Sequence, residues 1–304
     1  FFLQTAFQTF FVTAGKPSLG LAVTVLGGIA NMVLDYVFMA LMQMGVAGAA
    51  AATGIGYCIP AVSGVLFFLA AKDNPLRFRM PKPDWKVLFD ACMNGSSEMV
   101  TNLANAVTTF LFNYTLMQFY GEDGVASITI ILYFQYLFTA LYFGYSNGIA
   151  PIISFKYGNH DHEQLQGMFQ NSILFLVTSS LLANVLIHLT VSKALTIFTP
   201  AGSGVYQITL HGFSIYSIAF IIMGLGIFAS AMFTAFSDGK TSAIISFSRT
   251  FIFIVGAILV LPGILGEIGV WMAVPIAEGL GFLVAVYYLV KKRNQFHYIS
   301  ESRK

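Results

Sequence analysis

Long apolar stretches recur along the whole chain, separated by short polar or glycine-containing segments. Residues 1–13 are predicted to be the end of one helix, and eight complete membrane spans are predicted after it, since a bilayer core takes about 20 apolar residues. These spans cover residues 17–44, 46–71, 86–119, 124–155, 164–191, 204–236, 241–263 and 269–290. The stretches lack the polar–apolar alternation of a membrane β-barrel. The pattern therefore predicts an all-α polytopic membrane protein.

Composition supports this prediction. Hydrophobic residues make up 57% of the 304 residues and charged residues only 9%, against about 25% charged residues in a soluble domain. The chain therefore cannot cover a water-facing surface, which excludes a soluble enzyme, a nucleic-acid-binding domain and a disordered chain. No H-E-x-x-H motif occurs, and the one match to G-x-S-x-G, at residues 144–148, lies inside a predicted membrane span and not at a strand-to-helix turn, so no enzyme and no cofactor are expected.

Charges divide the connecting segments into two alternating sets. All of the 15 basic residues except Lys193 and Arg249 lie in one set or in the tail. The positive-inside rule places this set in the cytoplasm of a bacterial-type plasma membrane, with the carboxyl terminus on the same side. Trp85 and Trp271 fall near predicted membrane interfaces, where tryptophans gather.

The connection around residues 73–86 is the longest polar segment, and it contains three prolines. We predict that it links two helical bundles across the cytoplasmic face. Residues 1–72 then form the first bundle, residues 87–292 a second bundle of six helices, and residues 293–304 a cytoplasmic tail. Residues 15–18 and 45–48 also resemble residues 239–242 and 266–269, which indicates parallel repeats of the kind that transporters use.

Three polar residues converge in the first bundle. Asn31 and Asp35 lie four residues apart and share a helix face. Asp35 lies about 15 Å before the turn at Gly45, and Thr53 about 12 Å after it, so the antiparallel helices bring them to similar depth. Their oxygens suit Na⁺, and the carboxylate can equally hold a proton. A structural hydrogen-bond cluster is the alternative.

Further polar residues inside predicted spans are candidates for substrate or proton binding, or for a structural role: Glu98, Asn102, Asn105, Arg249 and Glu278. A charge at the bilayer centre costs at least ~2.5 kcal/mol, so each charged residue needs a reason to be there. Arg249 and Glu278 lie at matching depth on consecutive helices and can form a buried salt bridge. Beyond Na⁺ at Asn31, Asp35 and Thr53, no metal site is predicted.

Several motifs resemble the multidrug and toxic compound extrusion (MATE) family, in its MepA-like branch. They are Leu26-Gly27-Gly28, Asn31-Met32-Val33-Leu34-Asp35-Tyr36, the segment Gly45 to Thr53, Asn94-Gly95-Ser96-Ser97-Glu98, and Gly148 to Ser154. The resemblance covers nearly the whole chain, in order. It implies twelve helices in two six-helix lobes, of which this chain would hold the end of the fourth to the twelfth, making it amino-terminally truncated.

The resemblance also implies a function and a site. The family exports organic cations in exchange for Na⁺ or H⁺, and its amino-lobe cation site uses residues that match Asn31, Asp35 and Thr53. A further aspartate of that site would lie on the first helix, outside this chain. The acidic residues of the carboxy-lobe site in some members correspond to Asn105 and Met223 here, neither of them acidic, so such a site is in doubt.

We therefore expect a secondary multidrug antiporter that works by alternating access, as a monomer in the lipid bilayer, with small organic cations as substrates. A lipid-linked precursor flippase or another exporter of the same superfamily is the alternative. It should have a strongly basic cavity, whereas Arg249 is the one basic residue within a predicted span. An inactive truncated remnant is the third interpretation.

Overall fold

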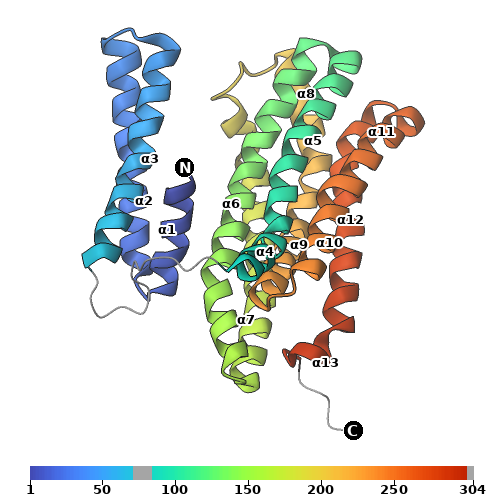
Figure 1. The fold of residues 1–304 in the computed structure, drawn as a ribbon. Coiled ribbons are helices and arrows are strands. Elements are labelled where there is room, and N and C mark those ends of the chain that lie inside the picture. Colours follow the sequence, from blue (N-terminus) through green and yellow to red (C-terminus); the bar gives the residue numbers. More distant parts are fainter. Residues whose placement is uncertain (71–83, 300–304) are drawn as a thin grey trace. The chain divides into compact units, whose positions relative to one another are not determined.

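The computed structural model is helical throughout the parts it describes, which are residues 1–70 and 84–299 without the side chains of residues 97, 98, 100 and 101. The all-α fold predicted from the apolar stretches is confirmed. The chain forms two compact units, Phe1–Asp84 and Trp85–Lys304 (Figure 1). The linker predicted at residues 73–86 and the end of the tail lie largely outside the described residues.

Unit 1 contains three α-helices, α1 (Phe2–Thr13), α2 (Pro17–Asp35) and α3 (Gly45–Ala70), and a six-residue π-helix, η1 (Tyr36–Leu41), that continues α2. Pro17 starts α2 at a position where its missing N–H costs nothing. The turn before α3 uses Gly45 at φ +58°, a conformation that glycine adopts readily. Phe7, Phe11, Val23 and Phe68 form the small core of this unit.

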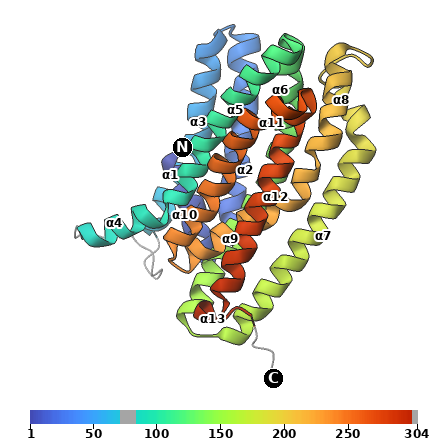
Figure 2. The same cartoon turned by 90° about the vertical axis from the view of Figure 1, so that its right-hand side faces the viewer.

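Unit 2 is a larger bundle whose long helices run along one another (Figure 2). Its helices are α4 (Trp85–Asn94), α5 (Ser96–Tyr120), α6 (Glu122–Gly158), α7 (His162–Leu195), α8 (Gly204–Tyr216), α9 (Ile218–Ala235), α10 (Gly239–Phe247), η2 (Ser248–Phe253), α11 (Ile254–Leu265), α12 (Glu267–Lys291) and α13 (Arg293–Phe296). Gly266 makes the turn between α11 and α12 at φ +61°, as Gly45 does before α3.

Seven helices in the described residues are long and apolar enough to cross a membrane, including α2 with η1, and α10 with η2 and α11. Seven of the eight predicted spans correspond to these helices, and the predicted span 86–119 does not. Residues 86–119 form two helices separated at Gly95, and the longer one, α5, is not among the seven. Its asparagines and threonines lower its hydropathy. The predicted span 204–236 is also divided, at Ser217, and only α9 qualifies by itself.

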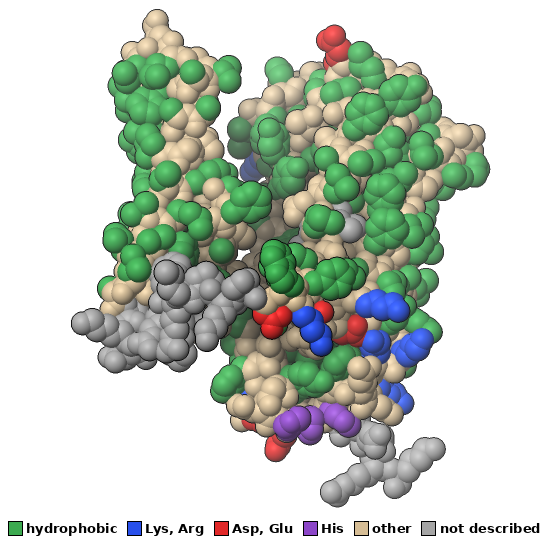
Figure 3. All heavy atoms as spheres, in the orientation of Figure 1, with side chains coloured by type: hydrophobic (Ala, Val, Ile, Leu, Met, Phe, Trp, Pro, Cys, Tyr) green, Lys and Arg blue, Asp and Glu red, His purple; other side chains and the backbone are tan. Residues whose placement is uncertain are grey.

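The core of unit 2 is rich in aromatic side chains, and its surface is largely apolar. Trp271 is fully buried and lies against Gly212, where a Cβ atom would come within 2.7 Å of the indole ring. Trp271 therefore packs inside the bundle and does not face lipid, whereas Trp85 is 78% exposed. Figure 3 shows the charged side chains of unit 2 gathered mainly at one end, around α13, below a surface of hydrophobic side chains.

Candidate functional site

The close crossing of α2 and α3 forms the base of the first candidate site. A Cβ atom on Gly27 would lie 2.6 Å from the carbonyl oxygen of Gly56, and one on Gly56 would lie 2.9 Å from Cβ of Asn31. Neither position has room for a side chain. Small residues allow transmembrane helices to approach at this distance, and here they bring the polar residues of the two helices together.

Asn31 and Thr53 lie about one helical turn from the two glycines of this crossing and contact each other. The Asn31 amide nitrogen donates a hydrogen bond of 3.5 Å to the Thr53 hydroxyl, which leaves the amide oxygen of Asn31 available. Both residues line a pocket of about 180 Å³. Its other lining residues are Gln4, Thr24, Gly27, Gly28, Gly56 and Tyr57. The pocket is therefore built from all three α-helices of unit 1.

Asp35 lies one helical turn beyond Asn31 and is not part of the pocket lining. Its Oδ1 atom is buried and, among the described residues, has no hydrogen-bond partner. The residue ends α2, and the π-helix η1 begins directly after it. Short π-helical segments are frequent at functional sites. The structure thus joins Asn31 and Thr53 but leaves the Asp35 carboxylate free to accept a ligand.

Gln4 was not foreseen from the sequence. It lies on α1 and lines the same pocket, and its Oε1 atom is buried without a hydrogen-bond partner in the described structure. Amide, hydroxyl and carboxylate oxygens are the ligands that hard cations such as Na⁺ take in proteins. The pocket and its surroundings provide these oxygens from Gln4, Asn31, Asp35 and Thr53.

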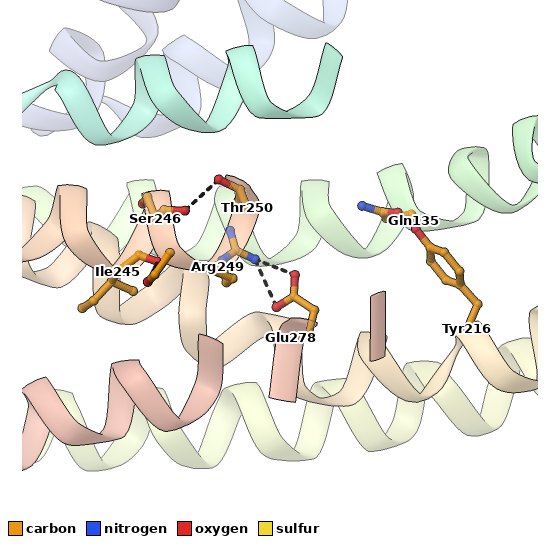
Figure 4. A network of polar contacts seen from close by, with 8 residues as sticks. Gln135, Tyr216, Ile245, Ser246, Arg249, Thr250 and Glu278 are labelled. Carbon is orange, nitrogen blue, oxygen red and sulfur yellow. Dashed lines mark hydrogen bonds and ion pairs between the residues drawn. The ribbon is translucent and has the colours of Figure 1, made fainter. Parts of the chain in front are cut away.

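A second polar centre lies inside unit 2 (Figure 4). Nη1 of Arg249 on η2 donates to both carboxylate oxygens of Glu278 on α12, at 3.0 and 3.3 Å. Both residues are almost fully buried, at 5% and 3% exposure. The Arg249 stem lies against Gly226 and Gly281, where Cβ atoms would come within 2.9 and 2.6 Å of it. The pairing expected from equal depth is thus present in the structure.

The remaining candidates lie on α5. Asn102 and Asn105 have exposed side chains, and the Asn105 carbonyl accepts a hydrogen bond of 2.9 Å from the Thr109 hydroxyl. The Glu98 side chain lies outside the described residues. In the described parts of the chain, no three His, Cys, Asp or Glu side chains are grouped to hold a metal ion.

Comparison of the fold with solved structures shows the class of protein. A MATE transporter in complex with MaL6 superposes with a TM-score of 0.88 at 20% identity, over 97% of this chain and 67% of that one. The outward-facing form of a multidrug resistance MATE family transporter gives 0.85 at 22% identity, over 93% and 64%. The fold is that of the MATE transporters.

Sequence comparison gives the family. The MatE family model matches residues 99–259, and the chain belongs to this family of membrane transporters. Multidrug export protein MepA of Staphylococcus saprophyticus is 20% identical over 94% of this chain and 63% of its own length. MepA of Staphylococcus haemolyticus is 21% identical over 97% and 66%. The chain spans just under two thirds of these relatives, which identify it as MepA-like.

Proposed function

We propose that the protein is a secondary antiporter that exports organic cations from the cytoplasm in exchange for Na⁺ or H⁺. Two observations support this. Its curated relatives are named as multidrug export proteins. Its first unit holds a pocket lined with neutral oxygen ligands, beside a buried carboxylate oxygen that has no partner in the described structure.

The pocket at Asn31 and Thr53 carries the proposal. An unpaired carboxylate inside a membrane span is costly, and a bound cation would remove that cost. The coupling cation would lie between the Asp35 carboxylate, the Asn31 amide oxygen and the Thr53 hydroxyl. It can drive transport only if it binds one arrangement of the transporter more tightly than the other. The π-helix η1, which follows Asp35, is a segment through which such a difference can reach α2.

The charge distribution supports an orientation for this transport. Lys156, Lys240, Lys291, Lys292 and Arg293 lie at or next to the ends of helices that meet at one end of unit 2. By the positive-inside rule this end faces the cytoplasm of a bacterial plasma membrane. Export then runs from this end toward the end that carries Glu122 and Glu267.

Efflux in cells tests the proposal. Cells that express the complete reading frame would be loaded with tetraphenylphosphonium, an aromatic organic cation, and its loss followed after energisation. Wild type is expected to export the probe, whereas Asp35→Asn is expected to be inserted in the membrane but inactive. Asp123→Asn, which changes an exposed carboxylate in the first turn of α6, is the matched control. Wild-type efflux by Asp35→Asn would overturn the role of the pocket.

A further inference from the structure

A row of buried hydroxyl groups connects α9 and α10 in unit 2. The Ser246 and Ser230 hydroxyls are 2.7 Å apart, and the Ser230 and Ser242 hydroxyls are 2.8 Å apart. The Ser242 hydroxyl is also 2.8 Å from that of Thr234. In each of these contacts either oxygen can be the donor. The three serines are less than 10% exposed.

This hydroxyl chain runs from the middle of unit 2 toward its basic end. Thr234 lies one residue before the end of α9, and its side chain is less buried than those of the serines. Asp238 and Lys292 form a salt bridge just beyond it. At the other end, Ser246 lies three residues before Arg249, on the same helix face. Figure 4 shows Ser246 and Arg249 side by side, with Glu278 next to them.

The Arg249–Glu278 ion pair, near the inner end of the hydroxyl chain, does not have the geometry of the strongest ion pairs. One nitrogen of Arg249 serves both carboxylate oxygens, instead of two parallel hydrogen bonds from two nitrogens. Nε of Arg249 is buried, and in the described structure it has no hydrogen-bond partner. Burying two charges is costly, and this pair recovers only part of that cost. It also lies at a π-helical segment, where helices often carry function.

The electrostatic surroundings of Glu278 are simple. Among the described residues of the helices packed against α12, Arg249 on η2 forms the ion pair with Glu278, and Tyr216 on α8 is the nearby titratable group. The Tyr216 hydroxyl donates to Gln135 on α6. Figure 4 shows Tyr216 and Gln135 on the opposite side of the ion pair from Ser246. Among the described residues, Glu278 is thus the carboxylate that lies near the inner end of the hydroxyl chain.

We propose that Glu278 is a proton-binding site, with Arg249 as its counter-ion, and that Ser246, Ser230, Ser242 and Thr234 carry its proton to the cytoplasmic end of unit 2. The carboxylate takes up one proton and the ion pair loses its attraction. On release, each hydroxyl oxygen accepts one proton and passes its own to the next, and the hydroxyls then rotate back to their starting direction, which the contacts permit because either oxygen can donate. This inference rests on the proposed antiport and adds an ion site to it.

The test replaces Arg249 and Glu278 together, so that neither charge stays buried without its partner. An apolar pair of similar volume in place of a buried ion pair is often neutral or stabilising, so Arg249→Met combined with Glu278→Met should fold. The complete protein would be reconstituted in vesicles loaded with tetraphenylphosphonium and a pH-sensitive dye, with the membrane potential clamped. We expect proton entry to accompany export in wild type, and to be lost in the double variant.

A second comparison tests the hydroxyl chain, and decides the question if the double variant does not fold. Ser246→Ala breaks the chain and is expected to slow proton entry without changing binding of the probe. Ser248→Ala is the matched control, because within the described structure the Ser248 hydroxyl bonds only to backbone carbonyls of the preceding turn, at 2.6 and 3.1 Å. Equal proton entry in these two variants would contradict the route.

The outcomes separate this inference from the proposed function. Wild-type proton entry in the double variant would make the Arg249–Glu278 pair structural and overturn the proton site. Export coupled to Na⁺ with no proton movement would leave the antiporter standing and also overturn the site. Export that is coupled to neither ion would overturn the proposed function, and the inference with it.

Discussion

Gly27 and Gly56 hold α2 and α3 so close together that neither can carry a side chain, since a Cβ atom on Gly27 would lie 2.6 Å from the Gly56 carbonyl oxygen. The contact between Asn31 and Thr53 depends on this approach, because the Asn31 Cβ atom lies within 2.9 Å of the Cβ position of Gly56. The cation pocket is therefore as much a product of the two glycines as of its polar residues.

Gly56→Ala is expected to push the helices apart and weaken cation binding. Replacing groups that orient ligands typically costs about 10–100-fold in metal affinity, and we expect a loss near the lower end of this range. The measurement is the Na⁺ or pH dependence of tetraphenylphosphonium binding to purified protein. Gly54→Ala, on the same helix but with open space around its Cβ position, should leave the dependence unchanged. Equal effects of the two variants would contradict the role of the crossing.

Gly212→Ala is expected to destabilise unit 2. The added Cβ atom would lie 2.7 Å from the fully buried indole ring of Trp271, and overpacking of this kind costs about 1–3 kcal/mol. Thermal unfolding followed by tryptophan fluorescence measures this directly, since the chain has only two tryptophans. Gly144→Ala, with no atom within 4 Å of its Cβ position, should not lower the melting temperature. A lower value for both variants would point to a general effect of alanine.

The salt bridge between Asp238 and Lys292 should make stability depend on pH in the acid range. Burial raises the pKa of Asp238, but hydrogen bonds from Lys292 and Thr241 outweigh it and hold the pKa below its ordinary value. The stabilisation is therefore complete above the ordinary pKa of about 4, and is lost as pH falls through the lowered value. Asp238→Asn removes this contribution.

Melting temperatures of wild type and Asp238→Asn, measured across this range, provide the check. The variant should be less stable at pH 7, and the difference should shrink below about pH 4. Glu163→Gln, which changes an exposed carboxylate in the first turn of α7, should show a small difference at every pH. A difference between Asp238→Asn and wild type that does not change with pH would contradict the assignment.

The helical fold could be predicted from the sequence because each span leaves a long apolar run. The helix breaks at Gly95 and Ser217 could not, since both lie within continuous stretches that are long enough for one helix. Their positions depend on tertiary contacts. Asn94 donates to the Thr234 carbonyl at 3.2 Å, and Asn184 to the Ser217 carbonyl at 2.9 Å.

The polar sites were only partly predictable. Equal depth in antiparallel helices pointed to Asp35 with Thr53 and to Arg249 with Glu278. The structure pairs Arg249 with Glu278, whereas the residue in contact with Thr53 is Asn31, one turn before Asp35. Asp35 does not line the pocket that Asn31 and Thr53 share, so a cation site that includes all three residues stays a prediction. The role of Gln4 could not be predicted, because the amino-acid sequence does not show which helices α1 packs against.

The hydroxyl chain did leave a signal that can be recognised afterwards. Ser230 and Thr234 are four residues apart, as are Ser242 and Ser246, so each pair forms a stripe on one helix face. The stripes lie on helices joined by a short turn, and therefore face each other. Serines and threonines are common in membrane helices, so only the structure shows that these four are linked.

The central claim is that a cation at Asp35 drives the export of organic cations. It is tested most directly by purified protein in vesicles, with an inward Na⁺ or proton gradient imposed in separate experiments. We predict that tetraphenylphosphonium moves out against its own gradient under one of the two ions, and that Asp35→Asn abolishes this movement. Uphill export by Asp35→Asn at the wild-type rate, or no uphill export by wild type under either gradient, would contradict the account.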